Sequence, residues 1–184
     1  NKITIIQAPH SRYELNTGYI SRLEFENTYA FALFMNTAHR YEEKSDKDKS
    51  DMAHNKNTYF QTITQTICDF FSSALIVQFH GYSNAKHKDI NQNISIILSD
   101  GTIRFYRKPA FQNITKRLVD ILGEESVGIF GINVHELGGT TNVQAQYING
   151  HSDDTFIHIE MSGKLRKEFL QDKNIRTNFI EVFY

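Results

Sequence analysis

ALIVQFHG, residues 74–81, is a nearly continuous apolar stretch that ends in a histidine and a glycine. Two earlier stretches have the same form: ITIIQAPH at residues 3–10 and AFALFMNTAHR at residues 30–40. Segments with helix-capping residues or helical spacing of apolar residues lie between and after them, at about residues 16–27, 57–71 and 109–122. Buried strands that alternate with helices are typical of a largely parallel sheet covered on both faces. We therefore predict a three-layer α/β protein, with a mostly parallel or mixed central sheet and helices on both faces.

The rest of the chain continues this pattern. Further strands are predicted at residues 94–98, 103–106, 126–131 and 155–161. The tail, residues 164–183, is helical in pattern with one break near Asn174, whereas residues 41–50 are rich in charge and indicate a solvated loop. A length of 184 residues without internal repeats predicts a single catalytic domain, residues 1–184.

Composition narrows the choice of partners. The net charge is −1 and the pI is about 6.8, which gives no electrostatic support for a nucleic acid or an anionic membrane. No apolar run approaches the roughly 18 residues of a membrane span. Cys68 is the single cysteine, so an internal disulfide framework is excluded. The chain opens at Asn1, which is compatible with removal of a leader or tag, and the sequence predicts neither compartment nor oligomeric state. The expected partner is a small-molecule or peptide-like substrate.

Side chains that bind metals or transfer protons follow the apolar stretches. His10, the His39-Arg40 pair and His80 come at or just after the ends of three stretches, and Glu160 ends a fourth. Ligands of parallel α/β sheets bind outside the carboxyl ends of the strands. We therefore expect these residues to meet at one edge of the sheet.

Three of the predicted site residues are candidate metal ligands: His10, Glu14 and His80. Imidazole nitrogen and carboxylate oxygen together suit Zn²⁺, and catalytic zinc sites keep a fourth position open for water. The alternative is structural. His10 would then bond a loop carbonyl beside a solvated Glu14, and His80 would only cap its strand.

Glu160 is the candidate catalytic base. In FIHIEMS, residues 156–162, alternation puts Phe156, His158 and Glu160 on one face of a strand. A carboxylate at the end of a buried strand is costly unless it is paired or functional. A base that deprotonates metal-activated water suits this position, and a structural ion pair with Arg166 or another cation is the alternative.

Arg40, Asp51 and His54 flank the charged stretch and are candidate substrate-binding residues. The planar fork of Arg40 suits a substrate carboxylate. Asp51 and His54 could orient metal ligands, form a rival metal set with His39, or merely pin the loop. The glycine-rich loop at residues 137–142 lacks the spacing of a phosphate-binding loop and is read as a turn.

Taken in order, His10, Glu14, His80 and Glu160 resemble the site of zinc hydrolases of the carboxypeptidase-like fold, nearest the N-formylglutamate amidohydrolase and phage poly-γ-glutamate hydrolase branches. FHGYS at residues 79–83 is similar to the His-Ser-Tyr-Ser type of segment around their third zinc ligand. Arg40 with Asp51 looks like the Arg and Asp that approach the substrate. The resemblance implies Zn²⁺ as cofactor. Two features depart from the family: the chain is short, and His10 and Glu14 are not spaced His-x-x-Glu, so that Glu24 or Glu26 could replace Glu14.

The sequence therefore predicts a zinc-dependent hydrolase that cleaves an amide or peptide-like bond, such as that of an N-acyl amino acid or a γ-glutamyl compound. Two alternatives stay open: a peptidoglycan N-acetylmuramoyl-alanine amidase, and a non-catalytic α/β binding domain. A serine hydrolase is disfavoured because there is no Gly-x-Ser-x-Gly elbow, and Cys68 belongs to a predicted core helix. Neither a Gly-x-Gly-x-x-Gly loop nor a Walker loop indicates an organic cofactor.

Overall fold

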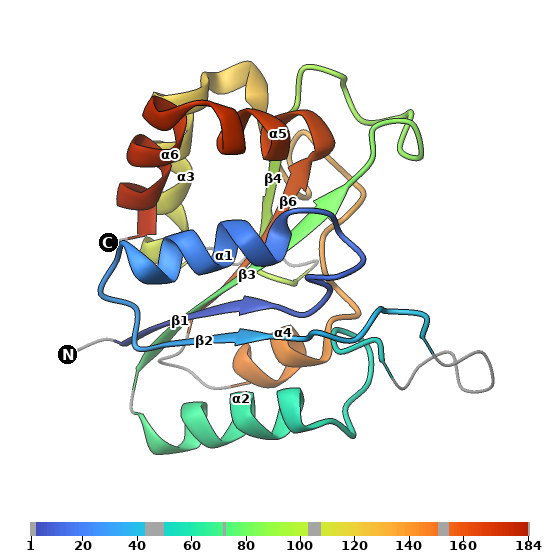
Figure 1. Ribbon diagram of the computed structural model, residues 1–184, viewed down its shortest axis with the longest axis vertical. Coiled ribbons are helices and arrows are strands. Elements are labelled where there is room, and N and C mark those ends of the chain that lie inside the picture. Colours follow the sequence, from blue (N-terminus) through green and yellow to red (C-terminus); the bar gives the residue numbers. More distant parts are fainter. Residues whose placement is uncertain (1–2, 43–49, 72, 103–107, 151–154, 184) are drawn as a thin grey trace.

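The computed structural model describes residues 3–42, 50–71, 73–102, 108–150 and 155–183, which form one mixed β-sheet with helices on both faces (Figure 1). The strands are β1 (Ile3–Ala8), β2 (Ala32–Met35), β3 (Ala74–Tyr82), β4 (Ile96–Ser99), β5 (Val127–Ile129) and β6 (Thr155–Ser162). Their order in the sheet is β2-β1-β3-β6-β4-β5. Strands β2, β1, β3 and β6 are parallel to one another. Strand β4 runs antiparallel to β6, and β5 runs parallel to β4. The predicted mixed, mostly parallel α/β sheet is confirmed.

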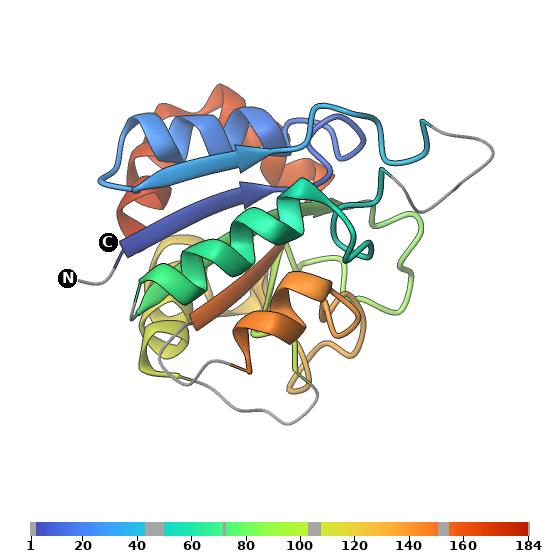
Figure 2. The same ribbon diagram turned by 90° about the horizontal axis from the view of Figure 1, so that it is seen from below.

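The sheet separates the helices into two layers (Figures 1 and 2). A hydrophobic cluster joins each layer to its face of the sheet. The larger cluster joins the sheet to four helices: α1 (Thr17–Glu26), α3 (Pro109–Leu122), α5 (Gly163–Gln171) and α6 (Lys173–Ile180). The smaller cluster joins the opposite face to α2 (Tyr59–Phe70) and α4 (Val143–Ile148). Short 3-10 turns, Glu124–Ser126 and Glu181–Phe183, follow α3 and α6.

Helix ends follow local sequence signals. Thr58, at the predicted start of this helix, caps α2 by accepting a hydrogen bond from the Gln61 backbone N–H at 3.1 Å. Pro109 begins α3, where its missing N–H costs nothing. Gly123 ends that helix with a φ of 85°, a conformation that favours glycine. The predicted break in the tail falls at Asp172, between α5 and α6.

Some expectations differ from the structure or fall outside it. The short helix α4 was not predicted, and Phe70, an aromatic residue near the end of the predicted helix at residues 57–71, is 79% exposed. Predicted strand 103–106 and most of the charged stretch, residues 43–49, lie outside the described residues. Among the described helices, none combines the length and hydropathy required to span a membrane.

Candidate metal centre

The carboxyl ends of β1, β3 and β6 bring polar side chains together on the face of the sheet that α2 and α4 cover. In β3, Leu75, Val77 and Phe79 enter the larger hydrophobic cluster, so that Gln78 and His80 point to the other face. The parallel register pairs His80 with Glu160 and Gln78 with His158 on β6. One face of two adjacent strands therefore changes from apolar to polar toward its carboxyl end.

His10, Glu14 and His80 form the first group whose side-chain donor atoms could hold one ion, because these atoms lie within 4.8 Å of one another. The backbone carbonyl of His10 accepts hydrogen bonds from the N–H groups of Tyr13 and Glu14, both at 2.9 Å, which turns Glu14 back toward the sheet. Glu14 Oε1 lies 2.8 Å from His10 Nδ1, and Glu14 Oε2 lies 3.3 Å from His80 Nδ1. Its Oε2 also accepts a hydrogen bond from the Gly81 N–H at 3.0 Å.

His80, His158 and Glu160 form a second such group, which shares His80 with the first. The rings of His80 and His158 lie 4.5 Å apart, and His158 Nε2 is 3.9 Å from Glu160 Oε1. Among the described residues, no partner hydrogen-bonds to the buried His158 Nδ1. Sequence reasoning did not count His158 among the candidate ligands. The signal was its alternation with Glu160 on one strand face.

Buried amides fix the orientation of His80. Its Nε2 lies 2.8 Å from Gln78 Oε1, which also accepts a hydrogen bond from Asn142 Nδ2. Gln78 Nε2 donates to Gln7 Oε1 at 2.9 Å and to Gln144 Oε1 at 3.2 Å. Because Gln78 Oε1 can only accept, the network assigns the proton of a neutral His80 to Nε2 and leaves the Nδ1 lone pair facing Glu14.

Asp51 connects His10 to Arg40 and His54. Its Oδ1 lies 2.8 Å from His10 Nε2 and 3.0 Å from His54 Nδ1. Arg40 occupies Oδ2 with its Nε and Nη2, at 2.8 and 2.7 Å. His54 Nε2 is 3.1 Å from Thr141 Oγ1, so the glycine-rich loop is attached to this network. The structure thus brings Arg40, Asp51 and His54 together beside His10.

The glycine-rich loop also covers His158. A Cβ on Gly139 would lie 2.8 Å from the His158 ring, and Gly139 has a φ of 61°. Ser99 Oγ donates to the backbone carbonyl of Gly138 at 2.6 Å, which ties the loop to the end of β4. The loop at residues 137–142 is therefore more than a connecting turn, because a glycine there permits close contact with a site histidine.

Burial and neighbouring charges shift the pKa values of Glu14, Asp51 and His80. Burial would raise the pKa of Glu14, but the adjacent His80 and His10 outweigh it and hold that pKa well below its usual range. Burial would likewise raise the pKa of Asp51, yet its bonds to His10 and His54 hold it low. Burial lowers the pKa of His80 despite the adjacent Glu14. An ionised carboxylate and a neutral imidazole are the forms that bind metal.

His10 and the second group behave differently. Burial alone would lower the pKa of His10, but its contacts with Asp51 and Glu14 outweigh burial and raise that pKa. Burial and then the nearby His80 lower the pKa of His158. Burial and then the charge of Glu14 raise the pKa of Glu160 well above its usual range. Such a carboxyl group holds a proton more readily than a solvated one.

The structure also separates the alternatives that the sequence left open. Glu14, not Glu24 or Glu26, lies with the two histidines: Glu24 is fully buried on α1, and Glu26 pairs with Arg22 at 3.5 Å. His39 belongs to neither group and contacts the rings of two tyrosines, Tyr13 and Tyr41.

The suggested ion pair between Arg166 and Glu160 is not found. Among the described residues, Arg166 Nη2 donates to the Tyr82 carbonyl at 3.3 Å, while its Nε and Nη1 have no hydrogen-bond partner.

Comparison of the chain with protein-family models, with curated proteins and with solved structures finds no significant match. The site therefore has to be interpreted from its own chemistry.

Proposed function

We propose that this protein is a zinc-dependent hydrolase that cleaves an amide or peptide-like bond at the carboxyl edge of its sheet. The observation that carries the proposal is the pair of overlapping groups around His80, each with two kinds of metal-binding side chain and donor atoms within 4.8 Å. All five residues, His10, Glu14, His80, His158 and Glu160, are buried. Buried polar groups at such density are costly unless they are satisfied by a bound ion or a proton.

The donor set fits a divalent cation that accepts nitrogen and oxygen. The bare Nδ1 of His80 faces Glu14 Oε2 at 3.3 Å, and two lone pairs at that distance repel unless a cation or proton lies between them. We assign His10, Glu14 and His80 as the protein ligands, which is the mixture and number typical of catalytic zinc. His158, whose Nδ1 has no hydrogen-bond partner among the described residues, belongs to the second group, which shares His80 with these ligands.

Glu160 is the proposed catalytic base. When bound, zinc polarises the scissile carbonyl and lowers the pKa of water to about 7. The raised pKa of Glu160, caused first by burial, suits a carboxylate that takes a proton from the attacking water. The same carboxyl group then returns the proton to the leaving nitrogen. Its position opposite His80 across the β3–β6 pair supports this role.

Asp51, Arg40 and His54 are proposed to support the site where substrate enters. Asp51 accepts from His10 Nε2, which would direct His10 Nδ1 toward the metal, and such carboxylate–histidine pairs orient zinc ligands. Arg40 uses two of its donors to hold Asp51. The partly exposed Arg40 and His54 side chains lie at the rim, where they could also contact a substrate.

Metal analysis tests the proposal most directly. We expect about one zinc per chain in protein purified without chelators, and loss of that metal in His80→Ala. His87→Ala is the matched control, because His87 also contacts a carboxylate, Glu136 Oε2 at 2.7 Å, but belongs to neither group. Folded wild-type protein that takes up no zinc would overturn the proposal.

The bond cleaved is tested separately on the zinc-loaded protein. Amine release is measured with an N-formyl amino acid, a γ-glutamyl peptide, an ordinary peptide and peptidoglycan. Release from peptidoglycan alone would favour the muramoyl-alanine amidase. No release from any of these, with zinc bound and Glu160→Gln indistinguishable from wild type, would favour the non-catalytic binding domain.

A further inference from the structure

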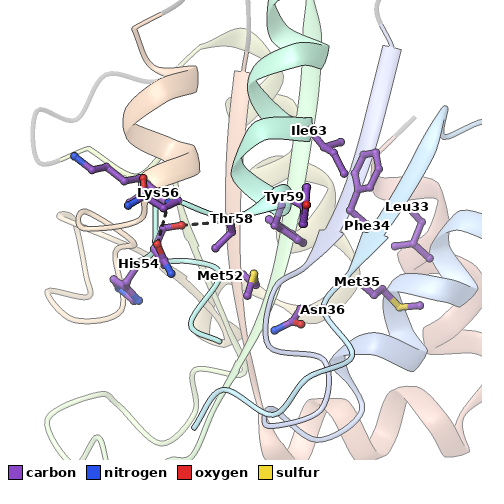
Figure 3. Close-up of a pocket in the computed structure, with 14 residues that line it drawn as sticks. Leu33, Phe34, Met35, Asn36, Met52, His54, Lys56, Thr58, Tyr59 and Ile63 are labelled. Carbon is purple, nitrogen blue, oxygen red and sulfur yellow. Dashed lines mark hydrogen bonds between the residues drawn. The ribbon is translucent and has the colours of Figure 1, made fainter. Parts of the chain in front are cut away.

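An open groove runs along the outer edge of β2, beside the candidate metal centre. It has a volume of about 1110 Å³, at or above the upper end of typical small-ligand sites. Figure 3 shows its walls: Leu33, Phe34 and Met35 from β2 on one side, and Tyr59 and Ile63 from α2 opposite them. Tyr59 is 89% exposed, Met35 39% and Ile63 38%, so the apolar walls face solvent.

The groove lies on the side of the sheet that α2 covers and extends to the β2 edge. Leu33 packs against the larger hydrophobic cluster and Phe34 against the smaller one, on opposite faces of the sheet. Both nevertheless line this single groove. Among the described strands, β2 is the outermost and pairs only with β1. A ligand in the groove therefore meets the unpaired backbone edge of a strand, which is a template for another extended chain.

One residue of the groove is linked to the candidate metal centre by side-chain contacts. His54 lines the groove and contacts Asp51 at 3.0 Å, and Asp51 in turn contacts His10 at 2.8 Å. Asn36, which follows β2 and also lines the groove, donates its backbone N–H to Ala8, the last residue of β1. A chain lying along β2 would therefore extend toward the loop that carries His10.

The chemistry of the lining favours a peptide over a lipid or acyl chain. Phe34 and Ile63 are interspersed with polar residues, among them Asn57 and Thr58, whereas an acyl chain would bury one continuous apolar wall. Among the described residues that line the groove, Lys56 carries a full charge and none is a carboxylate. The groove is complementary to an extended chain that has alternating apolar side chains and an acidic group.

We propose that the β2 edge groove binds an extended peptide as an added strand, with apolar side chains against Phe34, Tyr59 and Ile63 and an acidic group near Lys56. As a statement about substrate, this rests on the proposed hydrolase: its substrate would be a peptide chain that continues past the cleaved bond. Peptide binding itself needs no metal, so the two proposals can fail separately.

The test is binding of a fluorescein-labelled peptide, Ser-Phe-Thr-Leu-Ser-Glu, followed by fluorescence anisotropy with chelator present. We expect Met35→Lys, which puts a charge on the strand edge, and Tyr59→Ala to weaken binding about tenfold. Phe70→Ala is the matched control, an exposed aromatic of the same helix outside the groove, and should change affinity less than twofold. Methylating alternate backbone nitrogens of the peptide should weaken binding at least tenfold, because the pairing donors are lost while the side chains remain.

Four results would overturn the proposal. The first three are that wild type does not bind the peptide, that the methylated peptide binds as well as the unmethylated one, and that Phe70→Ala weakens binding as much as Tyr59→Ala does. The fourth is a wild-type dimer in light scattering that Met35→Lys dissociates, since a second copy of the chain would then occupy the edge. Peptide binding by protein that takes up no zinc would instead reject only the proposed hydrolase. Zinc-dependent hydrolysis with no peptide binding would reject only the groove.

Discussion

The two faces of β3 differ in the kind of side chain that they bury. One face carries Leu75, Val77 and Phe79 into a continuous apolar core, and the other carries Gln78 and His80 into a network of hydrogen bonds. All five side chains are buried, with exposures of 6% or less. Burial alone therefore does not distinguish a core residue from a site residue. What distinguishes them is that the site residues carry polar atoms, each of which needs a hydrogen-bond partner once it is buried.

The largest expected effect is on the polar side. Glu160→Gln keeps the shape of the side chain but removes its ability to accept a proton, so we expect kcat to fall by about 10²- to 10⁴-fold. Zinc content should remain at the wild-type level, since Glu160 is not among the proposed ligands. Steady-state kinetics and metal analysis on the same preparation check both points. A variant that loses its zinc would instead make Glu160 a ligand.

Truncation of a side chain on the apolar face should lower the stability of the protein and leave its zinc content unchanged. Phe79 is fully buried and its ring lies 5.7 Å from that of Phe183 and 6.4 Å from that of Phe179. Phe79→Ala leaves a cavity and should lower the free energy of unfolding by about 3–5 kcal/mol. Urea denaturation measures this, and Phe79→Leu, which retains most of the volume, is the milder control. The folded fraction should still bind zinc with wild-type stoichiometry. Loss of zinc without loss of stability would show that the two faces are not independent.

A carboxylate on the apolar side sharpens the comparison. Glu24 lies on the buried side of α1, neither of its oxygens has a hydrogen-bond partner among the described residues, and burial raises its pKa to about 8. Glu14 is also buried, but its partners hold its pKa low. Between the ordinary pKa of 4.5 and about 8, the unfolded chain loses this proton while the folded chain keeps it. Stability contributed by the neutral carboxyl is therefore lost as pH rises through this window.

Glu24→Gln should remove that pH dependence. We expect the variant to match wild type near pH 4 and to exceed it in free energy of unfolding by roughly 5 kcal/mol at pH 9. Urea denaturation across this range measures the difference. Glu26→Gln is the control, because Glu26 is exposed and pairs with Arg22 on the surface, and its effect should be near zero. Parallel pH profiles for wild type and Glu24→Gln would mean that the Glu24 carboxyl has a partner in solution.

The sequence predicted the central strands well, because a strand that is buried on both faces consists almost entirely of apolar residues. The helix expected at residues 109–122 coincides with α3, and the strand expected to start at residue 74 is β3. Side chains that follow the parallel strands had to meet at one edge, which is why His10 and His80 could be paired in advance. Strand direction leaves no such mark, so the antiparallel pairing of β4 with β6 was not predictable from alternation.

The missing parts of the site depend on register and on long-range contacts. Alternation placed His158 and Glu160 on one face, but only the pairing of His80 with Glu160 shows that His158 lies beside His80. The contact of Asp51 with His10 crosses 41 residues of sequence, and no local signal encodes it. Likewise, Gln78 is an unremarkable residue in the sequence, and its importance follows from the four side chains that meet at its amide.

The smallest expected effect comes from replacing Gln78, which positions a proposed ligand without binding the metal itself. Gln78→Met preserves length and approximate volume but removes the oxygen that accepts from His80 Nε2 and Asn142 Nδ2. The His80 ring would lose the bond that fixes its tautomer, so we expect zinc affinity to fall by about 10- to 100-fold. Competition with a chromophoric chelator measures this affinity, and Thr66→Val on the exposed side of α2 is a control that leaves the buried amides untouched. Unchanged affinity would mean that packing of His158 against His80, and not the amide, orients the ligand. The polar face would then be held by the same kind of contact as the apolar one.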